Sequence, residues 1–221
     1  MAGRVCAAIL AMVTVACGSS APDVPMPDIP GSGSVRALPQ CESDGEASFF
    51  PGNLLTDPAN LKPATDATRP IADLLHAMGE RSLSCGPASD SYRLFWLSAF
   101  ATSPGWEPTA IRITRGPNVW TIVVVRAQLR PQFRVIERHE QTLALDVSRG
   151  VVLAVDQFGF WTRPGFLANR DATDGRTWSV EGRHGNDYHA VVRVNEDENA
   201  VRKLALAFVN AAGIPPGHMV E

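Results

Sequence analysis

Residues that could do chemistry together are few in this chain, and the best-placed group falls in its C-terminal third. If a four-residue loop closes that region into a hairpin, Trp178, His189 and Arg193 share one face of it. Glu181 then lies on the opposite face, so a catalytic His–Glu pair within the hairpin is disfavoured. We therefore predict that this face serves packing or ligand binding.

Other patterns that could support catalysis or metal binding fail on spacing. His139 and Glu140 begin like a zinc-protease helix motif, but the second histidine would fall at Leu143. Segment 169–175 is similar to a calcium loop, but its glycine comes one position late and no closing glutamate follows. We predict no metal, no cofactor and no assigned catalytic residue. Enzymatic activity stays open: a non-catalytic binding module is favoured, and an envelope hydrolase using His189 is the alternative.

The thiol of Cys17 has the most specific expected chemistry. It follows a positive Arg4, a charge-free apolar run from Val5 to Val15 and the small residue Ala16. That run is shorter than the roughly 20 residues of a membrane-spanning helix. The segment resembles the lipobox of bacterial lipoproteins, in which the cysteine is acylated and becomes the first mature residue. We predict a lipoprotein signal peptide over 1–16 and lipidation at Cys17, with an ordinary cleaved secretory signal as the alternative.

The lipobox resemblance implies a place of work in the cell envelope. The membrane is then a partner through the lipid anchor, and in a cell with two membranes the protein faces the periplasm from the outer one. Residues 17–39 are rich in Pro, Gly and Ser, which predicts an extended tether. Residues 40–221 are expected to form a single domain. The net charge of −3 argues against nucleic acid, so an envelope protein, peptide or glycan is the expected ligand.

The remaining cysteines predict one disulfide. Cys6 leaves with the signal peptide and Cys17 is acylated, so Cys41 and Cys85 remain as a pair in an oxidising compartment. A bridge between them would close a long loop and contribute ~4 kcal/mol in the chain-entropy model. The alternative is a reactive thiol at Cys85, which has no His or Asn context to support it.

The first part of the domain predicts a helix and a central strand. Apolar residues at helical spacing predict a helix over Thr68–Arg81, with Thr68 as its cap and Pro70 in its first turn. Ser91–Phe100 alternates but is apolar on both faces, which is typical of a strand in the middle of a sheet.

Further strands are predicted by alternation and by turn residues. A charge-rich run over Phe133–Leu145 predicts an outer strand, and Gly159–Gly175 predicts a long loop. Two hairpins are expected, the first from Ala110–Thr114 with Val119–Leu129 and the second from Arg176–Gly182 with Tyr188–Val194.

The chain ends in the clearest helix pattern. Asn195 and Glu198 form a capping-box pattern, an apolar stripe includes Leu204 and Phe208, and Gly213 ends the helix. Together these elements predict an α+β fold: a mainly antiparallel β-sheet with packed helices, including a C-terminal amphipathic helix.

Several motifs resemble an uncharacterised bacterial family of exported or lipid-anchored proteins. They are YRLFWL at Tyr92–Leu97, FGFW at Phe158–Trp161, DGRTWSVEG at Asp174–Gly182 and the pair Tyr188-His189. The resemblance covers roughly Ser91 to Gly213 and implies a helix over Val147–Gln157, although the valines there favour a strand. It supports the fold and the envelope location, and implies no activity.

Overall fold

The structure is a computed structural model. It describes residues 49–50, 55–57, 62–85, 89–98, 107–169, 175–195 and 199–215. All of them belong to one compact unit, residues 32–221. The signal peptide, the tether, Cys17 and Cys41 lie outside the described residues, so the predictions made for them stay predictions.

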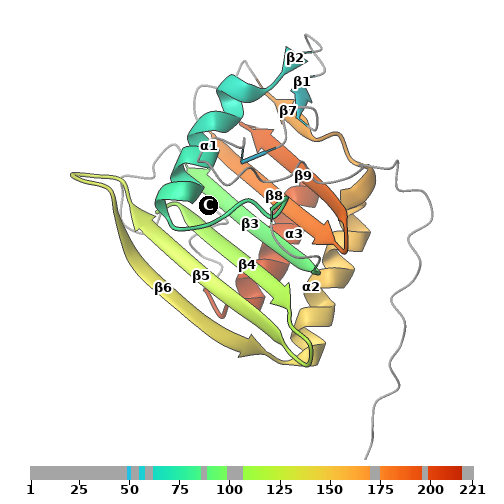
Figure 1. Ribbon diagram of the computed structural model, residues 1–221. Coiled ribbons are helices and arrows are strands. Elements are labelled where there is room, and N and C mark those ends of the chain that lie inside the picture. Colours follow the sequence, from blue (N-terminus) through green and yellow to red (C-terminus); the bar gives the residue numbers. More distant parts are fainter. Residues whose placement is uncertain are drawn as a thin grey trace, which may run out of the picture. The chain divides into compact units, whose positions relative to one another are not determined.

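A seven-stranded sheet forms the centre of this unit, in the order β6-β5-β4-β3-β8-β9-β7 (Figure 1). Every neighbouring pair is antiparallel except β7 and β9, which are parallel. The strands are β3 (Ser91–Ser98), β4 (Thr109–Arg115), β5 (Trp120–Gln128), β6 (Arg134–Leu143), β7 (Phe166–Ala168), β8 (Arg176–His184) and β9 (Asp187–Val194). A separate two-stranded sheet pairs β1 (Thr56–Asp57) with β2 (Lys62–Pro63).

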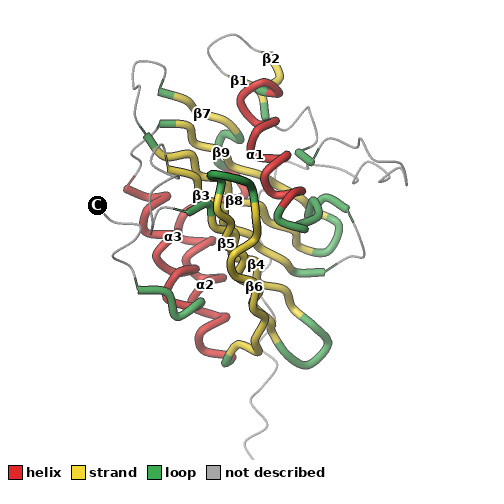
Figure 2. The backbone as a smooth tube through the Cα atoms, turned by 90° about the vertical axis from the view of Figure 1, so that its left-hand side faces the viewer, coloured by secondary structure: helices red, strands yellow, loops and turns green. Residues whose placement is uncertain are grey.

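Helices lie on both faces of the large sheet. α2 (Leu145–Phe158) and α3 (Asn199–Ala211) cover one face, and α1 (Thr65–Ala77) lies on the other, as Figure 2 shows with the sheet between them. A short 3-10 turn, η1 (Phe160–Thr162), follows α2. The α+β class and the mainly antiparallel sheet are confirmed. Within the described residues, none of the helices is long and apolar enough to cross a membrane.

The strand predictions are confirmed in type and in place. β3 is the middle strand of the seven and is buried on both faces, as its double apolar pattern predicted. β6 is an edge strand, as its charges predicted. Both hairpins form. The valine-rich segment is helical in α2, in line with the family resemblance and against the strand preference of valine.

The helix boundaries differ from the predictions. α1 begins at Thr65, so Thr68 is not its cap; the Thr68 hydroxyl donates instead to the Ala64 carbonyl, 2.9 Å away. The described part of α3 begins at Asn199, and residues 196–198 lie outside the described residues, so the capping box of Asn195 and Glu198 stays a prediction. Asn195 adopts a left-handed φ of 56° and directly follows the last paired residue of β9.

Of two predictions about segments between elements, one is confirmed and the other is wrong in part. Gly213 follows the end of α3 with a φ of 67°, which a glycine adopts without strain, so the predicted stop is confirmed. The predicted loop over Gly159–Gly175 is wrong in part, because it contains η1 and the short strand β7. β7 has only three residues, too few to show a period, and it forms because it pairs with β9.

Candidate functional site

The β8–β9 hairpin has the register that the sequence predicted. Trp178 pairs with Arg193 and Gly182 pairs with His189, so Trp178, His189 and Arg193 share one face. Glu181 lies on the other face, where it accepts a hydrogen bond of 2.7 Å from the Tyr188 hydroxyl. A His189–Glu181 pair is therefore excluded by the strand geometry.

His189 is 7% exposed and packs beneath the segment that follows α2. Its Nε2 lies 3.1 Å from the Arg163 carbonyl oxygen, and its ring meets that of Phe160 edge-to-face at 5.0 Å. Burial lowers the pKa of His189, and Arg193 nearby lowers it too, while the Arg163 carbonyl opposes both. Phe160 also fills the space above Gly182, where a Cβ would come within 2.5 Å of its ring. The imidazole is a neutral packing group at pH 7.

Trp178 and Arg193 are buried on the same face. The Arg193 Nη1 donates to the carbonyls of Pro164 and Val192, each at 3.0 Å. The Trp178 ring packs near that of Trp96, with 6.4 Å between ring centroids. The candidate binding face of Trp178, His189 and Arg193 is thus buried and offers little surface to a partner.

A network of buried charges occupies the other face of the sheet. Arg93 of β3 is 1% exposed, and its Nη2 forms an ion pair with Glu181 Oε2 of β8. Its Nη1 lies 3.2 Å from Glu80 Oε2 and donates to the Arg81 carbonyl at 2.7 Å. Burial lowers the pKa of Arg93 to about 10, while the nearby Glu80 raises it, so Arg93 remains a cation at pH 7.

Glu80 joins two further arginines to this network. Arg112 of β4 lies directly opposite Arg93, and its Nε donates to the same Glu80 Oε2 at 2.9 Å. Arg138 of β6 approaches Glu80 Oε1 at 3.6 Å. One carboxylate therefore holds together cations from three strands that would otherwise repel one another. Sequence analysis did not predict this network; its only signal was an arginine in a strand apolar on both faces.

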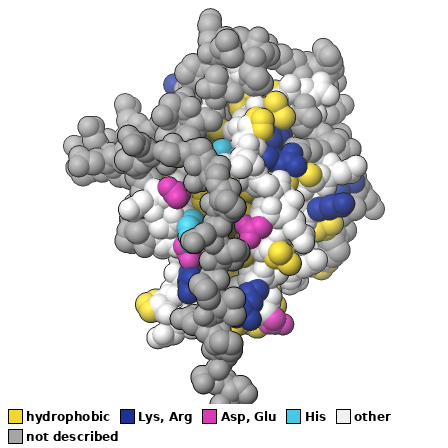
Figure 3. All heavy atoms as spheres, turned by 90° about the vertical axis from the view of Figure 1, so that its right-hand side faces the viewer, with side chains coloured by type: hydrophobic (Ala, Val, Ile, Leu, Met, Phe, Trp, Pro, Cys, Tyr) yellow, Lys and Arg dark blue, Asp and Glu magenta, His cyan; other side chains and the backbone are white. Residues whose placement is uncertain are grey.

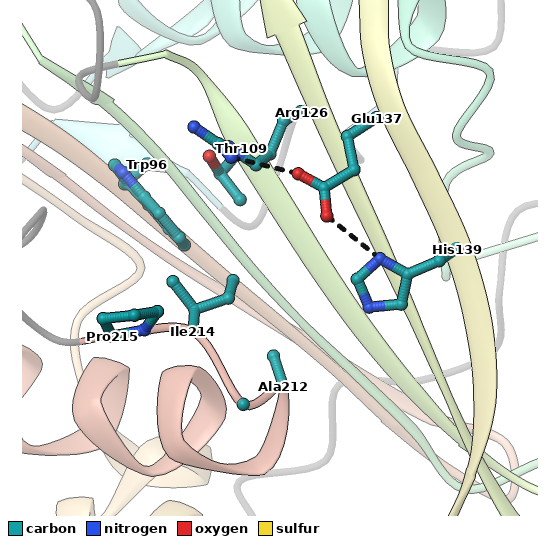
Figure 4. Close-up of a pocket in the computed structure, with 9 residues that line it drawn as sticks. Trp96, Thr109, Arg126, Glu137, His139, Ala212, Ile214 and Pro215 are labelled. Carbon is teal, nitrogen blue, oxygen red and sulfur yellow. Dashed lines mark hydrogen bonds and ion pairs between the residues drawn. The ribbon is translucent and has the colours of Figure 1, made fainter.

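An open cleft lies on the α3 side of the sheet, where Trp96 of β3, Thr109 of β4, Arg126 of β5 and two residues of β6 line it. It has a volume of about 220 Å³. Figure 4 shows Arg126, Glu137 and His139 on one side of it and the residues after α3, including Ile214, on the other. The Arg126 Nη1 lies 3.0 Å from Glu137 Oε2, and His139 Nδ1 lies 3.2 Å from Glu137 Oε1.

The cleft combines apolar surface with a wall of paired charges. Trp96 and Ile214 contribute the apolar surface. Arg126 is bound by two carboxylates, because its Nη2 also lies 2.8 Å from Glu107 Oε2. Of these two acids, only Glu137 lines the cleft. On the side of the molecule in Figure 3, described side chains of both signs are interspersed with apolar ones.

Cys85 is half-buried beside Ser84, whose Oγ lies 3.7 Å from its Sγ. Because Cys41 lies outside the described residues, the Cys41–Cys85 disulfide stays a prediction. In the part of the chain that the structure describes, no group of three or more His, Cys, Asp or Glu side chains is arranged to hold a metal ion.

Comparison with family models found no match for this chain, and comparison with curated proteins found none either. The resemblance to a family of exported proteins therefore rests on the motifs alone. The geometry of the cleft is the remaining basis for a function.

Proposed function

We propose that this protein is a bacterial cell-envelope lipoprotein that acts as a non-catalytic binding module. Cys17 would anchor it in the membrane, facing the periplasm from the outer membrane where the cell has two. Its ligand would be an extended peptide segment of an envelope protein, bound along β6. The observation that supports this best is that β6, an edge strand exposed on both faces, also forms the wall of the cleft.

The exposed edge of β6 suits strand addition. No described strand pairs with its outer side, and Val135 and Ile136 are 40% and 41% exposed. An extended peptide can complete such an edge with main-chain hydrogen bonds, while pockets select alternate side chains. The charges along β6 discourage non-specific pairing between edges, which leaves the strand available to a specific partner. A register shift between Arg126 and Ala127 leaves Ile136 as an extra residue in β6, so β6 bends beside the cleft, as bulged strands do next to binding sites.

The cleft would take one side chain of that peptide. Its volume of about 220 Å³ is below the roughly 300–1,000 Å³ of sites for whole small molecules. The Glu137 carboxylate lines the cleft and would bind a Lys or Arg side chain, whose apolar stem would lie against Trp96. The C-terminal helix supports the opposite wall: we propose that α3 is amphipathic and that its apolar side, which includes Leu204 and Phe208, holds Ile214 in place.

The alternative, an envelope hydrolase using His189, fits the contacts less well. The Nε2 of His189 lies against a backbone carbonyl, and Phe160 covers the ring. A general base must reach the proton that it removes, and only 7% of this residue is exposed.

A peptide-binding measurement tests the proposal. Phage-displayed decapeptides would be selected on the purified protein and measured by fluorescence polarisation against Glu137→Gln. We expect selected peptides to carry Lys or Arg and to bind this variant about tenfold more weakly, which is the loss of one charge-assisted contact. Glu140→Gln is the matched control: the same strand and charge change, on the opposite face. Equal weakening by both variants, or selection of no peptide, would contradict the proposal.

A second measurement addresses the envelope role. A photo-crosslinking residue at Ile136 should capture a discrete partner from native envelopes, and the same residue at Leu153 of α2, also exposed, should not. Loss of the Ile136 crosslink on adding a selected decapeptide would tie the partner to β6. Turnover of an envelope substrate that His189→Ala abolishes would support the hydrolase instead.

A further inference from the structure

A second concavity lies on the α1 face of the sheet, at the ends of the strands far from the cleft. It has a volume of about 370 Å³. Three arginines and several hydroxyl groups line it; the arginines are Arg81, Arg112 and Arg183. None of the described residues that line it is acidic. We call it the arginine–hydroxyl pocket.

Strand register builds the floor of this pocket. Ser91 of β3 pairs with Thr114 of β4 on one side and with Arg183 of β8 on the other, so the three side chains form one row. Their hydroxyls are linked: Ser91 donates to Thr114 at 3.3 Å, and Ser89 lies 3.2 Å from Ser91. The row therefore presents rotatable hydroxyl donors next to a fixed guanidinium.

The arginines beside this row carry more charge than the nearby acids balance. In the adjoining network, the guanidinium groups of Arg93, Arg112 and Arg138 share two carboxylates, those of Glu80 and Glu181. That count leaves one excess positive charge among these described groups, before Arg81 is added. An excess of positive charge near a low-dielectric interior attracts an anion strongly.

Asp90 is a described acid beside this pocket, and it is already engaged. Asp90 precedes Ser91, but its Oδ2 pairs with Arg115 Nη1 at 3.3 Å and its Oδ1 lies 2.8 Å from His184 Nδ1. Asp90 therefore does not supply a counter-charge to the arginines of the pocket, and no other acid is among its described lining residues.

We propose that the arginine–hydroxyl pocket binds a phosphate group. Guanidinium groups form paired hydrogen bonds with phosphate oxygens, and serine and threonine hydroxyls add single donors to the remaining oxygens. The pocket is large enough for a phosphate with a small group attached. The same chemistry fits a phosphorylated soluble ligand or a phospholipid headgroup. This site is separate from the peptide cleft, because the two lie on opposite faces and at opposite ends of β3 and β4.

Titration calorimetry at constant ionic strength tests the proposal with inorganic phosphate, glucose 6-phosphate and phosphatidylglycerol vesicles. The key variant is Arg81→Gln, because the Arg81 side chain is exposed and its loss leaves the buried network intact. We expect Arg81→Gln to bind the phosphate probes about tenfold more weakly, because the substitution removes one charge-assisted contact. Thr114→Val should weaken binding less. Arg149→Gln, an exposed arginine of α2, is the matched control and should bind like the wild type.

Each result of these titrations either supports or overturns the proposed phosphate site. Binding of inorganic phosphate or the sugar phosphate that Arg81→Gln weakens supports the site with a soluble source. Binding only of phosphatidylglycerol vesicles, with the same variant effect and none with neutral vesicles, supports a headgroup source. The proposal is overturned if no probe binds more tightly than chloride, or if Arg81→Gln and Arg149→Gln weaken binding equally.

Discussion

Replacing Arg93 by methionine should destabilise the protein strongly, because Arg93 is the centre of the buried charge network. Glu80 would keep two cations after the change, Arg112 at 2.9 Å and Arg138 at 3.6 Å. Glu181 would keep only the Tyr188 hydroxyl at 2.7 Å. The substitution therefore leaves one buried carboxylate without a counter-ion.

The size of the effect follows from that orphaned charge. Breaking a buried ion pair by removing one partner costs about 3–5 kcal/mol. The loss of the guanidinium over the Phe49 ring, 4.7 Å from its centroid, adds about 0.5–1 kcal/mol. We expect Arg93→Met to lower the free energy of unfolding by about 4 kcal/mol. Adding Glu181→Met should restore about 2 kcal/mol, since the remaining charge is then removed and the Tyr188 hydroxyl alone loses its partner.

Urea unfolding followed by tryptophan fluorescence measures these differences, and a double-mutant cycle isolates the coupling between Arg93 and Glu181. Arg115→Met is the control, because Arg115 pairs with Asp90 at 3.3 Å on the surface, where such pairs contribute at most about 1 kcal/mol. If Arg93→Met costs no more than Arg115→Met, or if the second substitution adds to the loss, the reasoning is refuted.

Four further predictions concern packing and processing. His189→Ala should lower the free energy of unfolding by about 1 kcal/mol at pH 7. Because burial lowers the pKa of His189, the unfolded wild-type chain binds more protons than the folded one below about pH 6.5. The wild type therefore loses this stabilisation in acid, and the difference between the two proteins should shrink in urea melts at pH 5. Trp178→Ala should cost ~3 kcal/mol in the same melts, and an unchanged midpoint would contradict its burial. Fatty-acid labelling should be lost in Cys17→Ser, and equal labelling would exclude a lipid anchor there. Non-reducing peptide mapping should show a Cys41–Cys85 link, and two freely alkylatable thiols would exclude it.

Much of the sheet could be predicted because the alternation of apolar and polar side chains along its strands is compatible with only one register. In the β8–β9 hairpin, a slip of one residue would move Glu181 among the aromatic residues beneath α2 and move Trp178 to the other face. The register is therefore determined by the side chains themselves. The same holds for β6, where charges on both faces are compatible only with an edge position.

The helix boundaries could not be predicted so well, because tertiary contacts decide them. Thr68 has the composition of a cap, but the chain before it already turns at Ala64, where the backbone pairs with Leu55. β7 has no pattern of its own and depends on β9. The buried charge network could not be predicted from sequence patterns, because it also depends on tertiary contacts. Glu80, Arg93 and Glu181 come together only when the sheet and the turn after α1 have both formed.

The two faces of the sheet are built by different means, and this determines where ligands have room. On one face, α2 and α3 bury aromatic and aliphatic side chains, and His189 and Arg193 bond to backbone carbonyls there. On the other, the single helix α1 lies over a sheet of seven strands, so Arg112 and Arg138 reach across to Glu80 just beyond its end. Both concavities lie beside the end of a helix: residues that follow α3 line the cleft, and residues that follow α1 line the arginine–hydroxyl pocket. The proposed peptide cleft and the proposed phosphate pocket thus depend on where these two helices stop.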